Sequence, residues 1–285
     1  MCPVANVELS RTDSLVAVGT RPNLAHPLTP DRASHQGAPI QPDHGFPMPV
    51  STTTRRPIRP MEGFATTCPR SAPDRPVRLF LPSDYQAKYA YPLVILFHAN
   101  GGDEDSAVRL APLLSRRNYI VACPRGPVAL GPGSTGRTGY AWTDKPTDGY
   151  LSSVLAYARE KYNIHSQRTY LVGVGEGAAA AYRFGLELPE GVGGVVALNG
   201  ELPTVRSKKA SGLRMFVGHG ESNPVVPVSE ARRSSRRLAT AGVDVRFQTY
   251  PTTDHVTADM LRDVNRWIMG TVNAGPDWLT PPNGS

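Results

Sequence analysis

The feature that most limits how this chain can fold is a repeated alternation, after Pro76, of short apolar runs with longer amphipathic stretches. The runs are rich in Val, Ile and Leu, which is typical of parallel strands covered on both faces. They are Val77–Leu81, Leu93–His98, Tyr119–Cys123, Thr169–Val174, Gly194–Leu198, Arg214–Val217 and Val243–Tyr250. Strands that alternate with helices predict an α/β fold with a doubly wound, mostly parallel sheet.

Three stretches between these runs carry apolar residues at spacings of three and four, as amphipathic helices do. The stripes are Val108, Leu110, Ala111, Leu113 and Leu114; Leu151, Val154, Leu155 and Ala158; and Met260, Leu261, Val264, Trp267 and Ile268. Another predicted helix carries four arginines on one side, namely Arg232, Arg233, Arg236 and Arg237. We expect them to form a solvated face, with Ala231, Leu238 and Ala239 turned inward; a site for phosphate or an acidic partner is the alternative.

The N-terminal quarter of the chain has a different composition. Its first 75 residues hold 12 of the 28 prolines but only two large aromatic residues, Phe46 and Phe64. Such a segment buries too little surface to offset the entropy of ordering it. We therefore predict a disordered or loosely attached Pro-rich arm over residues 1–55 and a lead-in over 56–75, for which an edge strand is one alternative. One α/β domain is expected over 76–272, and a tail over 273–285.

Charge and short motifs exclude several classes of protein. A net charge of +7 over 285 residues is too mild to indicate nucleic-acid binding. The first residues lack a secretory signal, and no window approaches the roughly 18 apolar residues of a membrane helix, so a cytoplasmic protein without a membrane span is expected. Cys2, Cys68 and Cys123 have no CxxC spacing, which argues against zinc sites and paired bridges. Three histidines recur every nine residues in the arm, where chance is favoured over metal binding: His26, His35 and His44.

Chemistry in an open α/β sheet sits in the loops beyond the carboxyl ends of the strands. Here one strand leads into His98-Ala99-Asn100-Gly101-Gly102-Asp103-Glu104, and another into Gly173-Val174-Gly175-Glu176-Gly177. A third leads into Gly218-His219-Gly220-Glu221-Ser222-Asn223 and a Val-Val-Pro run, and Asp254-His255 follows the last strand.

Four motifs in this order resemble the α/β-hydrolase superfamily, and within it the phospholipase/carboxylesterase and polyhydroxyalkanoate-depolymerase-like branch. In that family the first loop helps to form the oxyanion hole, the second is the Gly-x-Ser-x-Gly nucleophile elbow, and the triad acid and histidine follow. The resemblance implies that Gly175 stands at the nucleophile position, Asn223 at the acid position and His255 at the base position. Asn100, Gly101 and Glu176 are the implied oxyanion-hole residues, and His219 is expected to be structural.

Two of these positions depart from the chemistry of a serine hydrolase. Gly175 has no hydroxyl, so no acyl-enzyme can form there. Asn223 can hydrogen-bond an imidazole but cannot stabilise an imidazolium by charge. The sequence therefore predicts a catalytically inactive hydrolase-fold protein of carboxylesterase ancestry that binds a ligand or partner.

An active carboxylic-ester hydrolase with an unusual nucleophile such as Glu176 is the alternative. Placing Glu176 at the nucleophile position shifts the motif by one residue and puts Val174 where the turn needs a small residue. Glu221 and Glu201 are candidate substitutes for the triad acid. Tyr140, Trp142 and Tyr150 are candidates for the wall of a ligand pocket, or for ordinary core residues.

We expect a small acyl or ester-like ligand and no cofactor. The sequence has no P-loop, and Gly173-Val174-Gly175 lacks the acidic residue that a dinucleotide site places about 20 positions later. The Gly101-Gly102 pair also fits a simple turn before a helix that is capped near Asp103.

Overall fold

The computed structural model describes residues 63–132, 136–143, 149–188, 191–202 and 210–273. The predicted arm over residues 1–55, its three histidines and the last twelve residues of the chain lie outside these ranges, so the expectations for them stay predictions.

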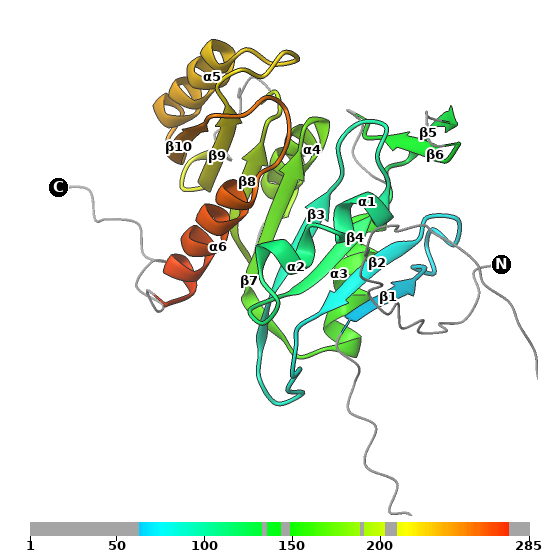
Figure 1. Ribbon diagram of the computed structural model, residues 1–285. Helices are drawn as coiled ribbons and strands as arrows, with labels where there is room; N and C mark the ends of the chain where they lie inside the picture. Colours follow the sequence, from blue (N-terminus) through cyan, green and yellow to red (C-terminus); the bar gives the residue numbers. More distant parts are fainter. Residues whose placement is uncertain (1–62, 133–135, 144–148, 189–190, 203–209, 274–285) are drawn as a thin grey trace, which may run out of the picture. The chain divides into compact units, whose positions relative to one another are not determined.

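One sheet of eight strands runs through the described part of the chain, in the order β1-β2-β4-β3-β7-β8-β9-β10 (Figure 1). Its strands are β1 (Gly63–Thr67), β2 (Val77–Leu81), β3 (Tyr91–Phe97), β4 (Ile120–Pro124), β7 (Ile164–Val174), β8 (Val192–Leu198), β9 (Arg214–Gly220) and β10 (Asp244–Tyr250). From β4 to β10 all neighbours are parallel, whereas β2 runs antiparallel to both β1 and β4. The predicted mostly parallel sheet is confirmed.

Helices cover both faces of this sheet and enclose two apolar clusters. They are α1 (Glu104–Val108), α2 (Ala111–Leu114), α3 (Tyr150–Lys161), α4 (Glu176–Glu187), α5 (Val228–Thr240) and α6 (Ala258–Asn273). One cluster joins the sheet to α3, α4 and α5 through residues such as Leu151, Ala178 and Leu238. The other joins it to α1, α2 and α6, for example through Leu114 and Ile268. Every residue of β3 is buried, as the continuous apolar run predicts.

One of the predicted helical stripes needs correction, and so does the predicted inward side of the helix that carries the four arginines. The stripe around Leu110 belongs to two short helices, because Pro112 lies in the first turn of α2 and a proline cannot continue a helix from the preceding turn. Leu113 is 59% exposed and does not join the core.

On α5, Ala231 and Leu238 are buried as expected, but Ala239 is exposed and Ser235 is buried in its place. The Ser235 hydroxyl donates to the Ala231 carbonyl at 2.8 Å, which satisfies its polar group inside the core. The four arginines of this helix are exposed.

The structure also adds elements to those predicted. A two-stranded hairpin of β5 (Val128–Pro132) and β6 (Thr138–Ala141) follows β4. Strand β9 continues to Gly220, so His219 lies inside a buried strand rather than in the loop after it. Strand β1 forms one edge of the sheet.

Cys68 takes part in a disulfide bond, so the expectation of no bridges is wrong for this residue. Cys123 is a free, buried thiol. Among the described helices, none has the length and apolar character needed to cross a membrane.

Candidate functional site

A sharp turn joins β7 to α4 at the centre of the sheet, with Gly175 at its apex. Gly175 has φ 55° and ψ −125°, a backbone conformation that residues other than glycine rarely adopt. The turn is also crowded: a Cβ on Gly173 would clash with the Gly177 carbonyl, and a Cβ on Gly177 would lie 2.6 Å from the His98 carbonyl oxygen. The glycine spacing is therefore required by close backbone packing.

The loop after β3 lies beside this turn and is fixed by a buried histidine. His98 Nε2 accepts a hydrogen bond from the Gly126 N–H at 2.9 Å, so Nδ1 carries the proton and donates to the Ala99 carbonyl at 2.8 Å. Burial lowers the pKa of His98 from its ordinary value of 6.5. Trp142 Nε1 donates to the His98 carbonyl at 3.0 Å. His98 thus holds the loop in place as a neutral side chain.

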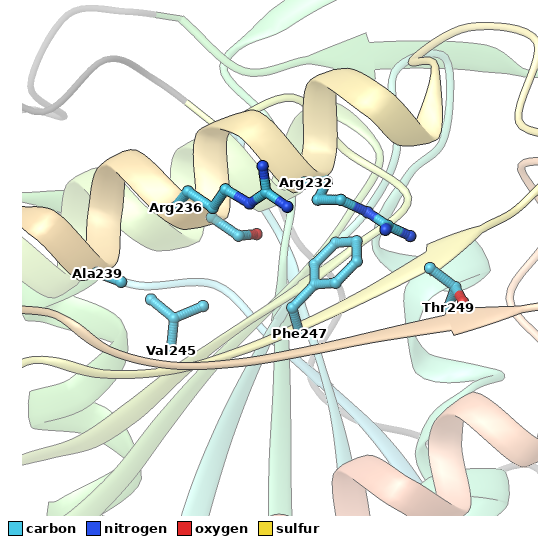
Figure 2. Close-up of a pocket in the computed structure, with 7 residues that line it drawn as sticks. Arg232, Arg236, Ala239, Val245, Phe247 and Thr249 are labelled. Atoms are coloured by element: carbon cyan, nitrogen blue, oxygen red, sulfur yellow. The ribbon is translucent and has the colours of Figure 1, made fainter.

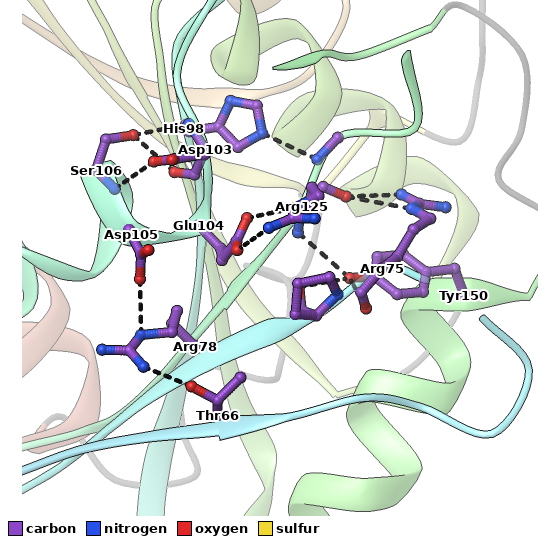
Figure 3. A network of polar contacts seen from close by, with 12 residues as sticks. Thr66, Arg75, Arg78, His98, Asp103, Glu104, Asp105, Ser106, Arg125 and Tyr150 are labelled. Atoms are coloured by element: carbon purple, nitrogen blue, oxygen red, sulfur yellow. Dashed lines mark hydrogen bonds and ion pairs between the residues drawn. The ribbon is translucent and has the colours of Figure 1, made fainter. Parts of the chain in front are cut away.

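A network of charged residues is connected to the same loop (Figure 3). Asp103 caps α1 in a reciprocal capping box with Ser106, as predicted for this turn. Glu104 is buried and forms a bidentate ion pair with Arg125, whose Nε donates to Glu104 Oε2 at 2.7 Å. Arg125 precedes Gly126, the donor to His98. The ion pair therefore ties α1 to the chain segment that orients the histidine.

Tyr150 and Arg75 complete this network (Figure 3). Arg75 donates to the Arg125 carbonyl at 2.9 Å, and its guanidinium lies 3.6 Å from the centre of the Tyr150 ring. The Tyr150 hydroxyl donates to the Arg75 carbonyl at 3.2 Å. Tyr150 is completely buried and packs with the core residues of its cluster.

The three predicted oxyanion-hole residues have different surroundings. The Gly101 N–H donates to the Tyr140 carbonyl at 3.0 Å, so it is not available to an oxyanion. Asn100 is exposed on the same loop. Glu176 is the first residue of α4, where backbone N–H groups lack an intrahelical acceptor. Of the three, Glu176 has the backbone position best suited to hold a negative charge.

Asn223, at the predicted acid position, is buried and serves the backbone of its own loop. Its Oδ1 accepts from the N–H groups of Val225 and Val226, both at 2.9 Å. Its Nδ2 donates to the Asn199 carbonyl at 3.4 Å. The side chain therefore closes an Asx-type turn, a role in which asparagine is common.

Asn199 links this loop to its neighbours and was not singled out by the sequence. It has φ 56°, and its side chain accepts from the Gly220 N–H at 2.8 Å and donates to the Asp254 carbonyl at 3.0 Å. Non-glycine residues with such a backbone are often found at functional sites, and asparagine tolerates it best. An Asn-Gly pair directly after a strand, here Asn199-Gly200, is the sequence signal by which this turn could have been found.

His255, at the predicted base position, is not among the hydrogen-bond partners of the Asn223 side chain in the described residues. Its side chain is 84% exposed, and its nearest charged partner is Asp254, with Nδ1 and Oδ1 3.8 Å apart. His219 is buried and its Nε2 is hydrogen-bonded to the Val226 carbonyl at 2.8 Å. These contacts fit the structural role expected for His219, and the described residues contain no assembled histidine–acid pair at Gly175.

A cleft of about 550 Å³ opens over the turn at Gly175. Its lining is Trp142, Gly175, Glu176, Ala179, Arg183, Asn199, Gly200, Glu201, Val225 and Val226. The predicted pocket residue Trp142 and the substitute acid Glu201 thus lie at the cleft, whereas Tyr140 lies under the Arg125 guanidinium, which is 4.5 Å from its ring centre. Glu221 accepts a hydrogen bond from Thr249 at 3.0 Å and does not line the cleft. No group of three potential metal ligands occurs among the described residues.

Comparison with known proteins agrees with this arrangement of loops. The sequence model of the phospholipase/carboxylesterase family matches residues 147–271, a range that contains Gly175, Asn223 and His255. The described part of the chain has the α/β-hydrolase fold, and residues 147–271 are similar to this family. The predicted resemblance to the superfamily is confirmed.

Solved structures show the same hydrolase fold. The crystal structure of esterase PE8 superposes with a TM-score of 0.56 at 22% identity, covering 68% of this chain and 97% of that one. Acyl-protein thioesterase 2 of Zea mays gives a TM-score of 0.53 at 20% identity, with 69% and 99% covered.

Curated relatives match the sequence over a shorter range. Acyl-protein thioesterase 1 of Mycosarcoma maydis is 31% identical over 124 residues, 40% of this chain and 52% of that protein. Acyl-protein thioesterase 1 of Debaryomyces hansenii is 28% identical over 116 residues, with 38% and 50% covered. The chain thus spans about half the length of the curated relatives that it matches.

Proposed function

We propose that this α/β-hydrolase-fold protein of carboxylesterase ancestry binds an acyl or ester-like ligand in the cleft over Gly175 and does not hydrolyse it. The observation that carries this proposal is the glycine at the apex of the turn from β7 to α4, which faces the cleft without a side-chain nucleophile. A serine hydrolase needs a hydroxyl at this apex to attack the ester carbonyl.

The residues at the acid and base positions also support loss of hydrolysis. The oxygen of Asn223 accepts from two backbone N–H groups, and the exposed imidazole of His255 has Asp254 as its ion-pair partner among the described residues. A general base needs a positioned partner that orients it and stabilises its charged form. Asn223 carries no charge to stabilise an imidazolium, and the His255 imidazole is 84% exposed beside Asp254, which supports the proposed loss of hydrolysis.

The lining of the cleft and the names of the relatives support the ligand class. Trp142, Ala179, Val225 and Val226 give the cleft an apolar part that suits an acyl chain. Relatives of the chain are named acyl-protein thioesterases and esterases.

Ester hydrolysis tests the loss of activity. Turnover of p-nitrophenyl acetate and butyrate by the full chain is expected to equal that of the His255→Ala variant, and a fluorophosphonate probe is expected not to label the protein. A turnover of about 1 s⁻¹ or more that is lost in His255→Ala would overturn the proposal. Glu176→Gln then tests the alternative, an ester hydrolase with a carboxylate nucleophile.

Ligand binding is tested separately. Tryptophan fluorescence is expected to change when octanoate is added, because Trp142 lines the cleft. Ala179→Leu, which adds volume inside the cleft, should abolish this change. Ala258→Leu is the matched control, since Ala258 is an exposed alanine at the start of α6. Equal responses of the two variants would show that octanoate binds elsewhere.

A further inference from the structure

A second cavity lies away from the turn at Gly175, between α5 and the edge strand β10. It has a volume of about 430 Å³, within the range of sites for small molecules. Its lining is Arg232, Ser235, Arg236, Ala239, Val245, Phe247 and Thr249, a set that we call the α5–β10 groove. None of these residues belongs to the cleft at Gly175.

The groove combines two guanidinium groups with an aromatic ring. Figure 2 shows Arg232 and Arg236 projecting from α5 above β10, with Phe247 standing between Val245 and Thr249. The two arginines are four residues apart, so they share one face of the helix. The Arg232 guanidinium lies 5.8 Å from the centre of the Phe247 ring.

These two arginines lack an acidic partner within the described ranges, in contrast to their neighbour. Arg233 pairs with Glu230 at 3.1 Å, but no carboxylate of the described residues lies within ion-pair distance of Arg232 or Arg236. Two unneutralised guanidinium groups on one wall of a cavity attract an anion, and their planar N–H groups match the oxygens of a phosphate.

The rest of the lining limits the kind of anion. Phe247, Val245 and Ala239 give an apolar floor, so the ligand needs an aromatic or apolar group beside its charge. The Thr249 hydroxyl donates to Glu221 at 3.0 Å and is therefore already occupied. The charged residues of the lining are Arg232 and Arg236, so the charged end of a ligand is directed toward these two guanidinium groups.

We propose that the α5–β10 groove binds phosphate monoesters that carry an aromatic group. The phosphate is held by Arg232 and Arg236, and the aromatic group lies against Phe247. This site is independent of the cleft at Gly175 and of the function proposed for it.

Calorimetric titration of the full chain with phenyl phosphate, inorganic phosphate and phenol tests the proposal. Phenyl phosphate should bind most tightly, inorganic phosphate more weakly, and phenol without measurable heat. Removing both guanidinium groups in Arg232→Gln/Arg236→Gln should weaken phenyl phosphate by about tenfold or more, as expected for charge-assisted hydrogen bonds. Phe247→Leu should reduce the affinity for phenyl phosphate to that for inorganic phosphate.

The matched control is Arg233→Gln/Arg237→Gln, which removes the same charge from the same helix outside the groove. It should retain the affinity for phenyl phosphate within about threefold, because exposed charges at a distance are screened by salt. Equal losses in the two double variants would show a general attraction to the helix and overturn the proposal. Phenol binding as tightly as phenyl phosphate, or no binding of phenyl phosphate at all, would also overturn it. Thermal unfolding of each variant confirms that the fold is retained.

Discussion

The loop after β3 and the loops after β9 and β10 border the same turn but are built differently. The first is fixed by a buried network. The Gly126 N–H donates to His98, and the neighbouring Arg125 forms an ion pair with the buried Glu104. In the second region, Asn223 bonds the backbone of its own loop and the Asn199 carbonyl, and His255 is exposed to solvent. The comparison teaches that a buried ion pair and a buried histidine fix the first region, whereas the second region combines a buried asparagine that bonds backbone groups with an exposed histidine.

The largest expected effect comes from breaking the network of the first region. Glu104→Gln should lower the free energy of unfolding by about 3–5 kcal/mol, because Arg125 would lose the charge of a buried partner. The Glu104 side chain is only 4% exposed. Urea denaturation measures the change.

Asp105→Asn serves as the control for Glu104→Gln. Asp105 pairs with Arg78 at 2.9 Å, but its side chain is 41% exposed. An exposed pair contributes little, so a loss below about 1 kcal/mol is expected. Similar losses in the two variants would contradict the contrast between buried and exposed pairs.

Asn223 and His255 should differ within the second region. Asn223→Ala removes the acceptor for two backbone N–H groups and should cost about 2 kcal/mol of unfolding free energy. Asn223→Asp keeps this acceptor and should recover part of the loss. His255→Ala should change stability by less than about 0.5 kcal/mol, as at most exposed positions. A larger loss of unfolding free energy in His255→Ala than in Asn223→Ala would contradict the structural role assigned to Asn223.

The turn at Gly175 lies between the two regions and should show a smaller effect. Gly175→Ser should destabilise the protein by about 1 kcal/mol, because a side chain must adopt a positive φ there. A Cβ at this position would also lie 3.2 Å from the Ala99 Cβ. Ala99→Gly in the same chain should remove this part of the cost, which a double-mutant cycle measures.

Gly175→Ser should gain little ester turnover, since His255 is exposed and Asn223 carries no charge. Clear stabilisation by the serine would show that residue 175 does not have the strained backbone on which the hydrolase alignment rests.

The pH dependence of stability should be the smallest effect and involves both regions. Burial lowers the pKa of His98 and of His219 from the ordinary value of 6.5. Below this pH the unfolded chain binds protons that the folded chain does not, so the free energy of unfolding should fall on acidification. His219→Gln removes one of these groups and keeps a donor for the Val226 carbonyl, so it should flatten the profile. His255→Ala is the exposed control, and a profile that His219→Gln leaves unchanged would contradict the expectation.

The apolar runs predicted most strands and the motif order predicted the superfamily, because both depend on local patterns. The break of the first helical stripe at Pro112 was harder to predict, because the apolar spacing continues across it. The burial of Ser235 was also harder to predict, because its hydroxyl is bonded within its own helix. The hydrogen bonds of Asn223 and the isolation of His255 could not be predicted. They depend on how loops from separate strands pack together, and the periodicity of apolar residues in a sequence does not indicate that packing.

Asn199 also has a consequence for motion. Its side chain bonds the Gly220 N–H and the Asp254 carbonyl, while its own carbonyl accepts from Asn223. Three loops that share one such residue cannot separate independently, because release of any of them exposes a buried polar group. The Gly220 amide, which bonds Asn199, and the Val225 and Val226 amides, which bond Asn223, should therefore exchange with solvent through one common opening event and show similar protection.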